Sequence, residues 1–203
     1  MFQLVESLRI ENGMLHHIRL HNHRLNNARN QLFRLNDPVD LGKIIKLPAS
    51  IGNERHKCRV TTTDGEHFSV EITPYHQREI KSLKLVHVAD IDYTYKTDQR
   101  ELLNQAFALR GDCDDIIIVK NGQLTDAWAA NIILSDGEKW YTPSTPLLKG
   151  IQREFLLSEG IIEEKKIHYS TLHNYKKIKL INALIDFDRA PEIDRSSIIT
   201  TEH

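Results

Sequence analysis

Cysteine, long apolar runs and an excess of either charge are all scarce in this chain. Its 203 residues include only two cysteines, Cys58 and Cys113, which stand far apart and in no metal-ligand spacing. We expect both thiols to be free and buried in a reducing cytoplasm. No apolar run approaches the roughly 20 residues that span a bilayer, and the first six residues lack the features of a signal peptide. The formal net charge of −1 argues against electrostatic attraction to nucleic acid or to an anionic membrane.

The composition that remains is typical of a globular protein with a substantial core. Forty per cent of the residues are hydrophobic and 27% are charged. A chain of this length folds as one large domain or as two small ones.

In the first half of the chain, turn residues separate short periodic segments. Residues 5–10 predict a strand that ends at the Asn12-Gly13 turn, and a second strand begins at Met14 and includes His16 and His17. Apolar residues at helical spacing predict a helix over residues 20–33. Two further strands, over residues 58–63 and 67–75, flank an Asp64-Gly65 turn, which is a strong hairpin signal.

The second half continues this alternation. We expect a helix over residues 98–109, a hairpin of residues 115–119 with 124–134, and a further strand over residues 139–142. A short helix over residues 152–158 ends at Gly160, which suits a left-handed cap. Residues 178–187 predict a final apolar strand, followed by a polar, frayed tail from Arg195.

Lys96 ends an aromatic run that begins at Asp92 and reads Asp-Tyr-Thr-Tyr-Lys. Burying an ammonium group is costly, so a lysine among strand-forming aromatic residues suggests a function. Burial favours the neutral amine, which can attack a carbonyl and form a Schiff base. The alternative is a lysine at an exposed strand end with its ammonium in water.

Three other features suit a phosphorylated pyridine cofactor. Asp126 lies among apolar residues, where a carboxylate could bind a protonated pyridine nitrogen. The turn over residues 148–152 opens a helix whose unpaired N–H groups favour a phosphate, and Arg24 could supply a cation to it. Each feature also has a purely structural interpretation: a turn-capping aspartate, an ordinary loop and a solvated arginine.

The order and spacing of these features resemble the class IV, or fold-type IV, pyridoxal-phosphate enzymes. The resemblance rests on residues 6–13, 20–25, 96, 115–131, 142–153 and 182–184, and it is firmest over residues 92–157. It implies an α+β fold of fold-type IV architecture. A small N-terminal α/β domain would comprise residues 1–90, and a larger C-terminal domain with a mixed sheet or pseudo-barrel would comprise residues 91–203. The resemblance implies that Lys96 forms the Schiff base, Asp126 holds the pyridine nitrogen, Arg24 binds the phosphate and Leu148 packs on the ring. The implied cofactor-binding residues are Arg24, Lys96, Asp126, Ala130, Asn131, Leu148, Gly150, Ile151 and Gln152.

Three departures from the family pattern bear on the activity. Asp126 stands where glutamate is usual, Gln152 stands where threonine is common, and the segment before Val5 is shorter than usual. We expect cofactor binding to tolerate these changes better than substrate specificity does. Lys96-x-x-x-Arg100 and the Ala-Ala-Asn run after Asp126 are similar to the lyases.

The resemblance therefore favours a lyase like 4-amino-4-deoxychorismate lyase, an enzyme of folate biosynthesis that releases pyruvate and forms 4-aminobenzoate. The alternatives are an aminotransferase acting on a branched-chain or D-amino acid and a protein that has lost catalysis. The implied partners are a small-molecule amino substrate and a second copy of the chain in a homodimer. Tyr95, Arg59 and Arg100 are candidates to bind the substrate carboxylate, although each can also be structural.

Four histidines, His16, His17, His21 and His23, lie close together in the sequence. His17 and His21 have the i,i+4 spacing of metal ligands on a helix. No cysteine or acidic pair completes a ligand set, so we interpret the cluster as a solvated polar face and expect no bound zinc.

Overall fold

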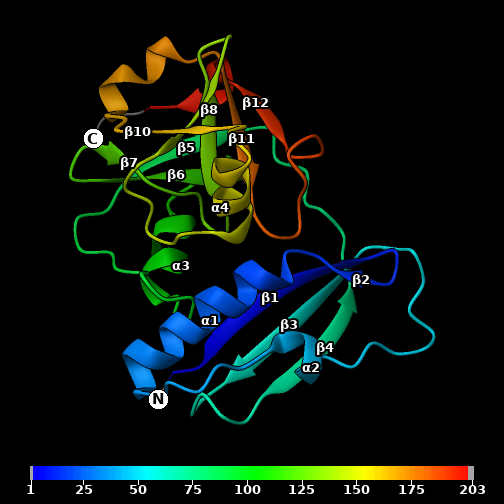
Figure 1. The fold of residues 1–203 in the computed structure, drawn as a ribbon. Coiled ribbons are helices and arrows are strands. Elements are labelled where there is room, and N and C mark those ends of the chain that lie inside the picture. The colour runs from blue at the N-terminus through cyan, green and yellow to red at the C-terminus, as the bar shows by residue number, and fades with distance from the viewer. Residues whose placement is uncertain (1, 201–203) are drawn as a thin grey trace. The chain divides into compact units, whose positions relative to one another are not determined.

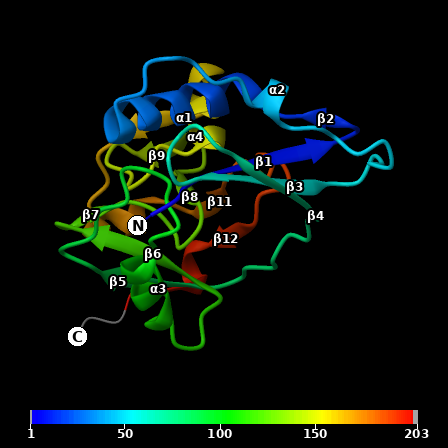
Figure 2. The same ribbon diagram turned by 90° about the horizontal axis from the view of Figure 1, so that it is seen from below.

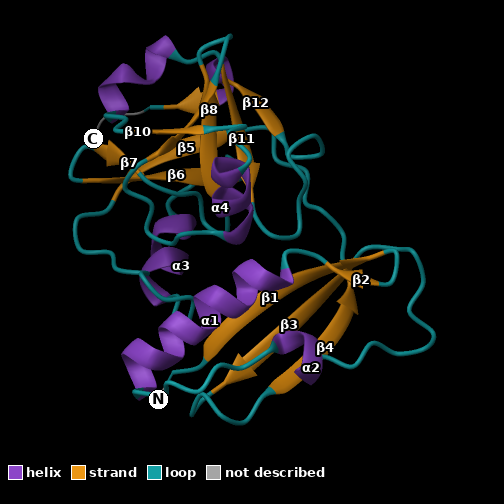
Figure 3. Cartoon of the chain, in the orientation of Figure 1, coloured by secondary structure: helices purple, strands orange, loops and turns teal. Residues whose placement is uncertain are grey.

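The computed structural model describes residues 2–200, and the chain divides into two compact units (Figures 1 and 2). Unit 1 comprises Met1–Gln77 and Tyr95–Gln99, and unit 2 comprises Arg78–Thr94 and Arg100–His203. Several sheets and a few helices make up the two units (Figure 3), which confirms the predicted α+β class. Among residues 2–200, no helix has the length and apolar character needed to cross a membrane. The predicted division at residues 90 and 91 stays a prediction.

Unit 1 contains one antiparallel sheet and two helices. The strand order is β2-β1-β3-β4, with the pairs β1–β2, β1–β3 and β3–β4 all antiparallel. Asn12 and Gly13 have φ angles of 54° and 67°, as the predicted Asn-Gly turn requires. The elements are β1 (Leu4–Glu11), β2 (Met14–Leu15), α1 (Ile18–Phe33), α2 (Leu41–Ile44), β3 (His56–Thr62) and β4 (Ser69–Pro74).

Helix α1 covers one face of this sheet because alternate residues of β1 are apolar. Leu4, Leu8 and Ile10 of β1 are at most 2% exposed and share a core with Leu25 and Ala28 of α1. The strands and helix predicted from alternation and periodicity are therefore confirmed. The prediction that His16 and His17 lie on a strand is wrong. They form a turn after β2, where His17 has a φ of 53°, a conformation that a strand cannot adopt.

A second stretch of chain, Tyr95–Gln99, also belongs to unit 1. Its backbone lies beside the start of β1: the N–H of Val5 donates to the carbonyl of Lys96 at 2.9 Å, and Leu4 pairs with Thr97 in an antiparallel bridge. Asp98 extends the pairing, since its carboxylate accepts from the N–H of Gln3 at 2.8 Å. Backbone pairing therefore fixes the position of Lys96 relative to β1.

Unit 2 contains two sheets, whose strand orders are β13-β5-β6-β7 and β10-β9-β8-β11-β12. Side chains from both sheets form one apolar core, with Ile117 and Leu124 from the first and Ile132 and Ile178 from the second, all 0% exposed. Helix α3 packs on the other side of β6 through Leu103. The strands are β5 (Leu83–His87), β6 (Asp115–Lys120), β7 (Gln123–Leu124), β8 (Asn131–Ser135), β9 (Trp140–Pro143), β10 (Glu163–Lys165), β11 (Lys177–Ile181), β12 (Glu192–Asp194) and β13 (Ile198–Ile199). The helices are α3 (Glu101–Ala108), α4 (Ile151–Ser158), η1 (Tyr169–Asn174) and η2 (Arg195–Ser197).

The single strand predicted over residues 124–134 is wrong, because the chain leaves one sheet and enters the other within it. Thr125 and Asp126 both pair with Ile118. The N–H of Thr125 donates to the carbonyl of Ile118 at 3.0 Å, and the N–H of Ile118 donates to the carbonyl of Asp126 at 2.8 Å. Because Thr125 and Asp126 lie opposite the single residue Ile118, the strand contains a β-bulge, which changes the direction of a side chain. A tight turn then closes through the N–H of Ala127 and the carbonyl of Ala130, and β8 begins at Asn131.

Two predictions at the C-terminal end are also wrong. The strand expected over residues 178–187 ends at Ile181, because a turn at Asn182 follows in which the carbonyl accepts from the N–H of Ile185. The tail expected to fray from Arg195 instead forms η2 and then β13, which pairs in parallel with β5. The short helix α4 is confirmed, and Gly160 after it has a φ of 67°.

Candidate functional site

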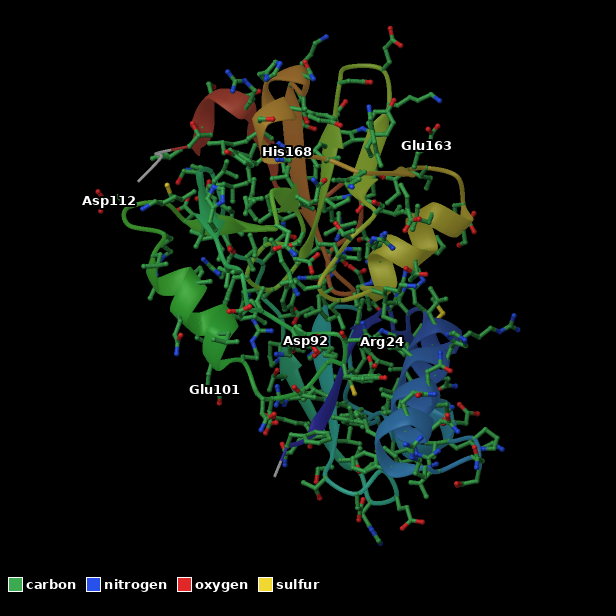
Figure 4. The ribbon with its side chains drawn as sticks, turned by 90° about the vertical axis from the view of Figure 1, so that its left-hand side faces the viewer. Arg24, Asp92, Glu101, Asp112, Glu163 and His168 are labelled. Atoms are coloured by element: carbon green, nitrogen blue, oxygen red, sulfur yellow. The ribbon has the colours of Figure 1, made fainter. Side chains whose placement is uncertain are left out.

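In unit 1, a buried carboxylate on β1 holds two basic side chains of α1. Glu6 is 3% exposed, and Arg24 bonds to it by a two-pronged contact: Nε donates to Oε1 at 2.9 Å and Nη2 donates to Oε2 at 2.6 Å. His21 Nδ1 lies 2.6 Å from the same Oε2. The Arg24 side chain, labelled on α1 in Figure 4, keeps 18% of its surface exposed, whereas His21 is completely buried.

The charges of this group follow from its contacts. Burial by itself would raise the pKa of Glu6, but Arg24 and His21 outweigh it and lower the pKa from 4.5 to about 2. Burial holds the pKa of His21 below its usual value, with Arg24 and Lys96 acting in the same direction and Glu6 opposing them. An ionised Glu6 can only accept, so the neutral His21 donates from Nδ1 and carries its lone pair on Nε2. That Nε2 is buried and has no hydrogen-bond partner among the described residues.

Lys96 lies in the same unit as this group. Its side chain is partly buried, and its charge contributes to the lowered pKa of His21. The backbone of Lys96 is paired with Val5, the residue next to Glu6. Two of the residues predicted from the sequence, Arg24 and Lys96, therefore belong to one part of unit 1.

In unit 2, a second buried carboxylate is held by neutral donors. Asp126, 5% exposed, accepts at Oδ2 from the N–H groups of Leu147 and Leu148, at 2.7 and 3.0 Å. Its Oδ1 accepts from Asn131 Nδ2 at 2.6 Å, and the same amide nitrogen donates to the carbonyl of Leu148 at 2.8 Å. Asp126 and Asn131 thus fix the loop that leads to α4.

Burial raises the pKa of Asp126 from 3.8 to about 6, against the opposing effects of the N–H of Leu148, the amide of Asn131, the N–H of Leu147 and the charge of Arg153. Each carboxylate oxygen has two lone pairs. Because Oδ2 already accepts two hydrogen bonds and Oδ1 accepts one, Oδ1 retains the capacity for one more donor.

Helix α4 begins directly after this loop. Gly150 is its N-cap, and a Cβ on Gly150 would lie 2.0 Å from Asn131 Oδ1, so the position leaves no room for a side chain. The N–H groups of the first helical turn, which includes Ile151 and Gln152, have no carbonyl four residues earlier within the helix. The Gln152 side chain is 3% exposed. A helix start of this kind favours an anion.

The structure therefore arranges the predicted residues in two groups. Asp126, Asn131 and Leu148 are joined by hydrogen bonds, with Gly150 and α4 immediately after them. Ala130 contributes a backbone carbonyl to the turn before β8. Arg24 is joined to Glu6 in unit 1.

Sequence reasoning missed Glu6 and underestimated His21. The signal for Glu6 was an acid at an inward position of an otherwise apolar alternation, between Leu4 and Leu8. His21 and Arg24 are three residues apart and so lie on one face of α1. The interpretation of the histidines as a solvated face is wrong for His21, which is completely buried, and His16 Nδ1 contacts Arg9 Nη2 at 2.9 Å. Among residues 2–200, no group of three or more His, Cys, Asp or Glu side chains could hold a metal ion.

The roles of the three candidates to bind the substrate carboxylate stay predictions, and the structure gives the surroundings of each. Arg100 donates to the carbonyl of Trp128 at 2.6 Å and to the Tyr93 hydroxyl at 3.3 Å, and it stacks over the Trp128 ring. Tyr95 packs against the core of unit 1, and Arg59 is a partly buried residue of β3. Both cysteines are free and buried, as predicted.

A protein family and a related protein both match most of this chain. Residues 3–192 match the family described as amino-transferase class IV. The chain is 38% identical over 186 residues to an uncharacterized protein of Haemophilus influenzae, covering 91% of this chain and 98% of that protein.

Similar solved structures include a candidate 4-amino-4-deoxychorismate lyase of Haemophilus somnus, with 31% identity, a TM-score of 0.84 and coverage of 91% of this chain and 97% of that one. A candidate amino-acid aminotransferase of Mesorhizobium loti has the same fold, with 21% identity, a TM-score of 0.82 and coverage of 98% and 100% of the two chains. The family match spans most of the described residues. The chain therefore belongs to the class IV aminotransferase family of pyridoxal-phosphate-dependent enzymes.

Proposed function

We propose that this enzyme is a lyase that converts 4-amino-4-deoxychorismate to pyruvate and 4-aminobenzoate. The observation that carries the proposal is the candidate lyase of Haemophilus somnus, which is 31% identical and is matched over 97% of its length. The motifs that resemble the lyases, Lys96-x-x-x-Arg100 and the Ala-Ala-Asn run after Asp126, support it.

Each unit, taken by itself, contains residues whose chemistry suits pyridoxal phosphate. In unit 1, Lys96 would provide the amine for the cofactor aldehyde, and Arg24, held by Glu6 through two hydrogen bonds, would provide a cation for the phosphate. In unit 2, the start of α4 provides N–H donors for a phosphate. When bound, the cofactor supplies an aldehyde that condenses with amines and a ring that withdraws electrons.

Asp126 fits the pyridine nitrogen, although its side chain is one methylene shorter than the usual glutamate. Its Oδ1 can accept one more hydrogen bond, and Asn131 holds that oxygen in place from the other side. A protonated pyridine nitrogen is a cation, so it would favour the ionised form of a carboxyl whose pKa burial has raised to about 6. We therefore propose that Asp126 holds the pyridine nitrogen and that Leu148, fixed by Asp126, packs on the ring.

Lys96 is the proposed general acid and base. Its amine would accept a proton from the substrate and return it. A one-way elimination needs a fit to only one substrate.

The second candidate is an aminotransferase acting on a branched-chain or D-amino acid, which the family match favours. Product analysis separates the two. The lyase predicts pyruvate and 4-aminobenzoate in equal amounts from 4-amino-4-deoxychorismate, without an added 2-oxo acid. Exchange of amino groups between an amino acid and a 2-oxo acid, without 4-aminobenzoate, would replace the lyase by the aminotransferase.

Borohydride reduction tests the assignment of Lys96 independently of the substrate. We expect a reduced pyridoxyl adduct on Lys96 in the peptide map, and none in a Lys96→Arg variant. An adduct-free protein that stays colourless with pyridoxal phosphate would favour the third possibility, a protein that has lost catalysis. Family resemblance further supports a homodimer in the cytoplasm, and sedimentation equilibrium tests the dimer.

A further inference from the structure

We propose that the buried guanidinium of Arg153 supplies a positive charge to the phosphate site at the start of α4. The inference rests on the proposed binding of pyridoxal phosphate at this helix start. It gives a function to a buried residue of the first helical turn to which the family resemblance assigns no role. All the residues concerned belong to unit 2.

The first argument is the cost of a cation at this position. Arg153 is the third residue of α4 and is only 1% exposed. Burying a charge is unfavourable, and the dipole of a helix disfavours a cation in its first turn. The Nε of Arg153 is also buried with no hydrogen-bond partner among the described residues. Stability alone therefore gives little reason for an arginine here, whereas an anion bound at this helix end would be attracted by it.

The second argument is that water weakens the charges that oppose Arg153. Its Nη1 donates to Glu154 Oε1 at 2.8 Å, and its Nη2 donates to Glu164 on β10 and to the carbonyl of Pro143 at 3.1 Å. The side chains of Glu154 and Glu164 are 41% and 50% exposed, so water screens their negative charges. The guanidinium itself is shielded from water. Its positive charge is therefore offset only in part inside the protein.

The third argument is that this charge acts beyond the direct contacts of Arg153. Burial raises the pKa of Asp126, and the charge of Arg153 opposes that rise. The hydrogen bonds of Asp126 come from Asn131 and from the N–H groups of Leu147 and Leu148. Leu148 precedes the N-cap Gly150 by two positions. A charge that acts on Asp126 thus also acts at the start of α4.

The experiment compares pyridoxal phosphate with pyridoxal, which lacks the phosphate. Equilibrium binding of each is measured by absorbance for the wild type, Arg153→Met and Arg153→Lys, and the readout is the ratio of the two affinities. Methionine has a long side chain without a charge, whereas lysine keeps the charge without the planar fork. We expect Arg153→Met to lower the ratio about tenfold and Arg153→Lys to keep it within about threefold of the wild type.

Glu164→Gln separates the charge of Arg153 from its role as an anchor. Glutamine can still accept a hydrogen bond from Nη2, but it no longer offsets the charge. We expect the ratio to rise, by only about twofold because Glu164 is half exposed. If Arg153 only anchored α4 to β10, the weaker hydrogen bond would leave the ratio unchanged or lower it. Because this variant changes an exposed side chain, it decides the question even if Arg153→Met does not fold.

Lys139→Met is the matched control. It removes a cation from the same unit, at the exposed ion pair with Glu163, and should leave the ratio unchanged. A second measurement needs no cofactor. NMR of the Asp126 carboxyl carbon should show that the pKa of Asp126 rises further in Arg153→Met and stays at its wild-type value in Lys139→Met.

The outcomes separate this inference from the proposed function. If the wild type binds pyridoxal phosphate no better than pyridoxal, the phosphate site at α4 fails, and the proposed cofactor role of this helix fails with it. If the wild type prefers pyridoxal phosphate but Arg153→Met keeps the full ratio, or Glu164→Gln does not raise it, Arg153 serves only the fold and the inference is wrong.

Discussion

Each unit contains a buried carboxylate, and the two respond to burial in opposite ways. Glu6 and Asp126 are 3% and 5% exposed, yet the pKa of Glu6 falls to about 2 while that of Asp126 rises to about 6. Glu6 is paired with a cation, Arg24, whereas Asp126 is held mainly by neutral N–H groups. Hydrogen bonds from neutral donors therefore do not offset the loss of water around Asp126. For Glu6, the positive charge of Arg24 offsets the loss of water.

The difference in pKa suits the two carboxyl groups to different functions. A group that is ionised at every physiological pH can hold a cation in place, as Glu6 holds Arg24. A group with a pKa near 6 responds to what binds beside it, as a carboxyl that receives a protonated ring nitrogen must. Four predictions test or refine this comparison.

The largest effect should come from removing the charge of Glu6. Glu6→Gln leaves Arg24 without its counter-ion, and we expect unit 1 to lose about 3 kcal/mol of unfolding free energy. Asp126→Asn should change the stability of unit 2 by less than about 1 kcal/mol, because losing a hydrogen bond is offset by removing a buried charge. Urea unfolding followed by circular dichroism measures both.

The tryptophans provide the control for that comparison. Trp128 and Trp140 both belong to unit 2, so tryptophan fluorescence follows that unit alone. A loss of unit 2 fluorescence in Glu6→Gln at the urea concentration that unfolds unit 1 would show that the units unfold together. Equal losses for Glu6→Gln and Asp126→Asn would contradict the contrast between the two carboxylates.

The next effect concerns the fit around Asp126. In Gly150→Ala the new Cβ would lie 2.0 Å from Asn131 Oδ1, so Asn131 must move away from Asp126. We expect a loss of about 2 kcal/mol, typical of an overpacked core, and a lower melting temperature. Gly52→Ala, where a Cβ meets nothing within 4 Å, should have little effect. Adding Asn131→Ala to Gly150→Ala should relieve the strain, and no relief would argue against this contact.

A smaller effect should appear as pH dependence. The folded pKa of Asp126, about 6, lies above its unfolded value of 3.8, so folded Asp126 binds more protons between pH 4 and 6. Its contribution to stability therefore increases as the pH falls through this window. We expect wild-type unit 2 to gain about 1 kcal/mol more than Asp126→Asn between pH 7 and pH 5. The low pKa of Glu6 predicts no such difference for Glu6→Gln until the pH falls below 4.5.

The smallest effect on stability is expected for an exposed ion pair, which serves as the reference for the buried pair. Lys139 and Glu163 form an ion pair at 2.7 Å in unit 2, with both side chains more than half exposed. Water screens such a pair, so Lys139→Ala should leave the urea midpoint unchanged. A loss approaching that of Glu6→Gln would mean that burial is not what distinguishes the Glu6–Arg24 pair.

Local signals predicted most of unit 1. The alternation in β1, the Asn12-Gly13 turn and the stripe of α1 each depend on neighbouring residues, and all three are confirmed. Residues 125–130 could not be predicted in this way. Residues 127–130 are apolar and suit a strand, and the bulge at Thr125 and Asp126 depends on pairing with Ile118 in another strand.

The same distinction applies to the candidate site. Lys96, Arg24 and Asp126 could be named from order and spacing, and their roles stay predictions. Their partners could not be named, because Glu6 contacts a helix that begins 12 positions later, and Asp126 contacts N–H groups 21 and 22 positions away. Backbone donors carry no signature in the sequence, so a contact such as Leu147 to Asp126 emerges only from the fold.

Strand β13 has a practical consequence for engineering this protein. Ile198 and Ile199 pair with Leu83 and Lys84, and Leu83 is completely buried. Truncation after Ser197 would leave the backbone donors and acceptors of β5 open at a sheet edge. Open edges recruit strands from other molecules, so shortened chains should aggregate. An expression tag is therefore better attached beyond residue 203 than in place of the last residues.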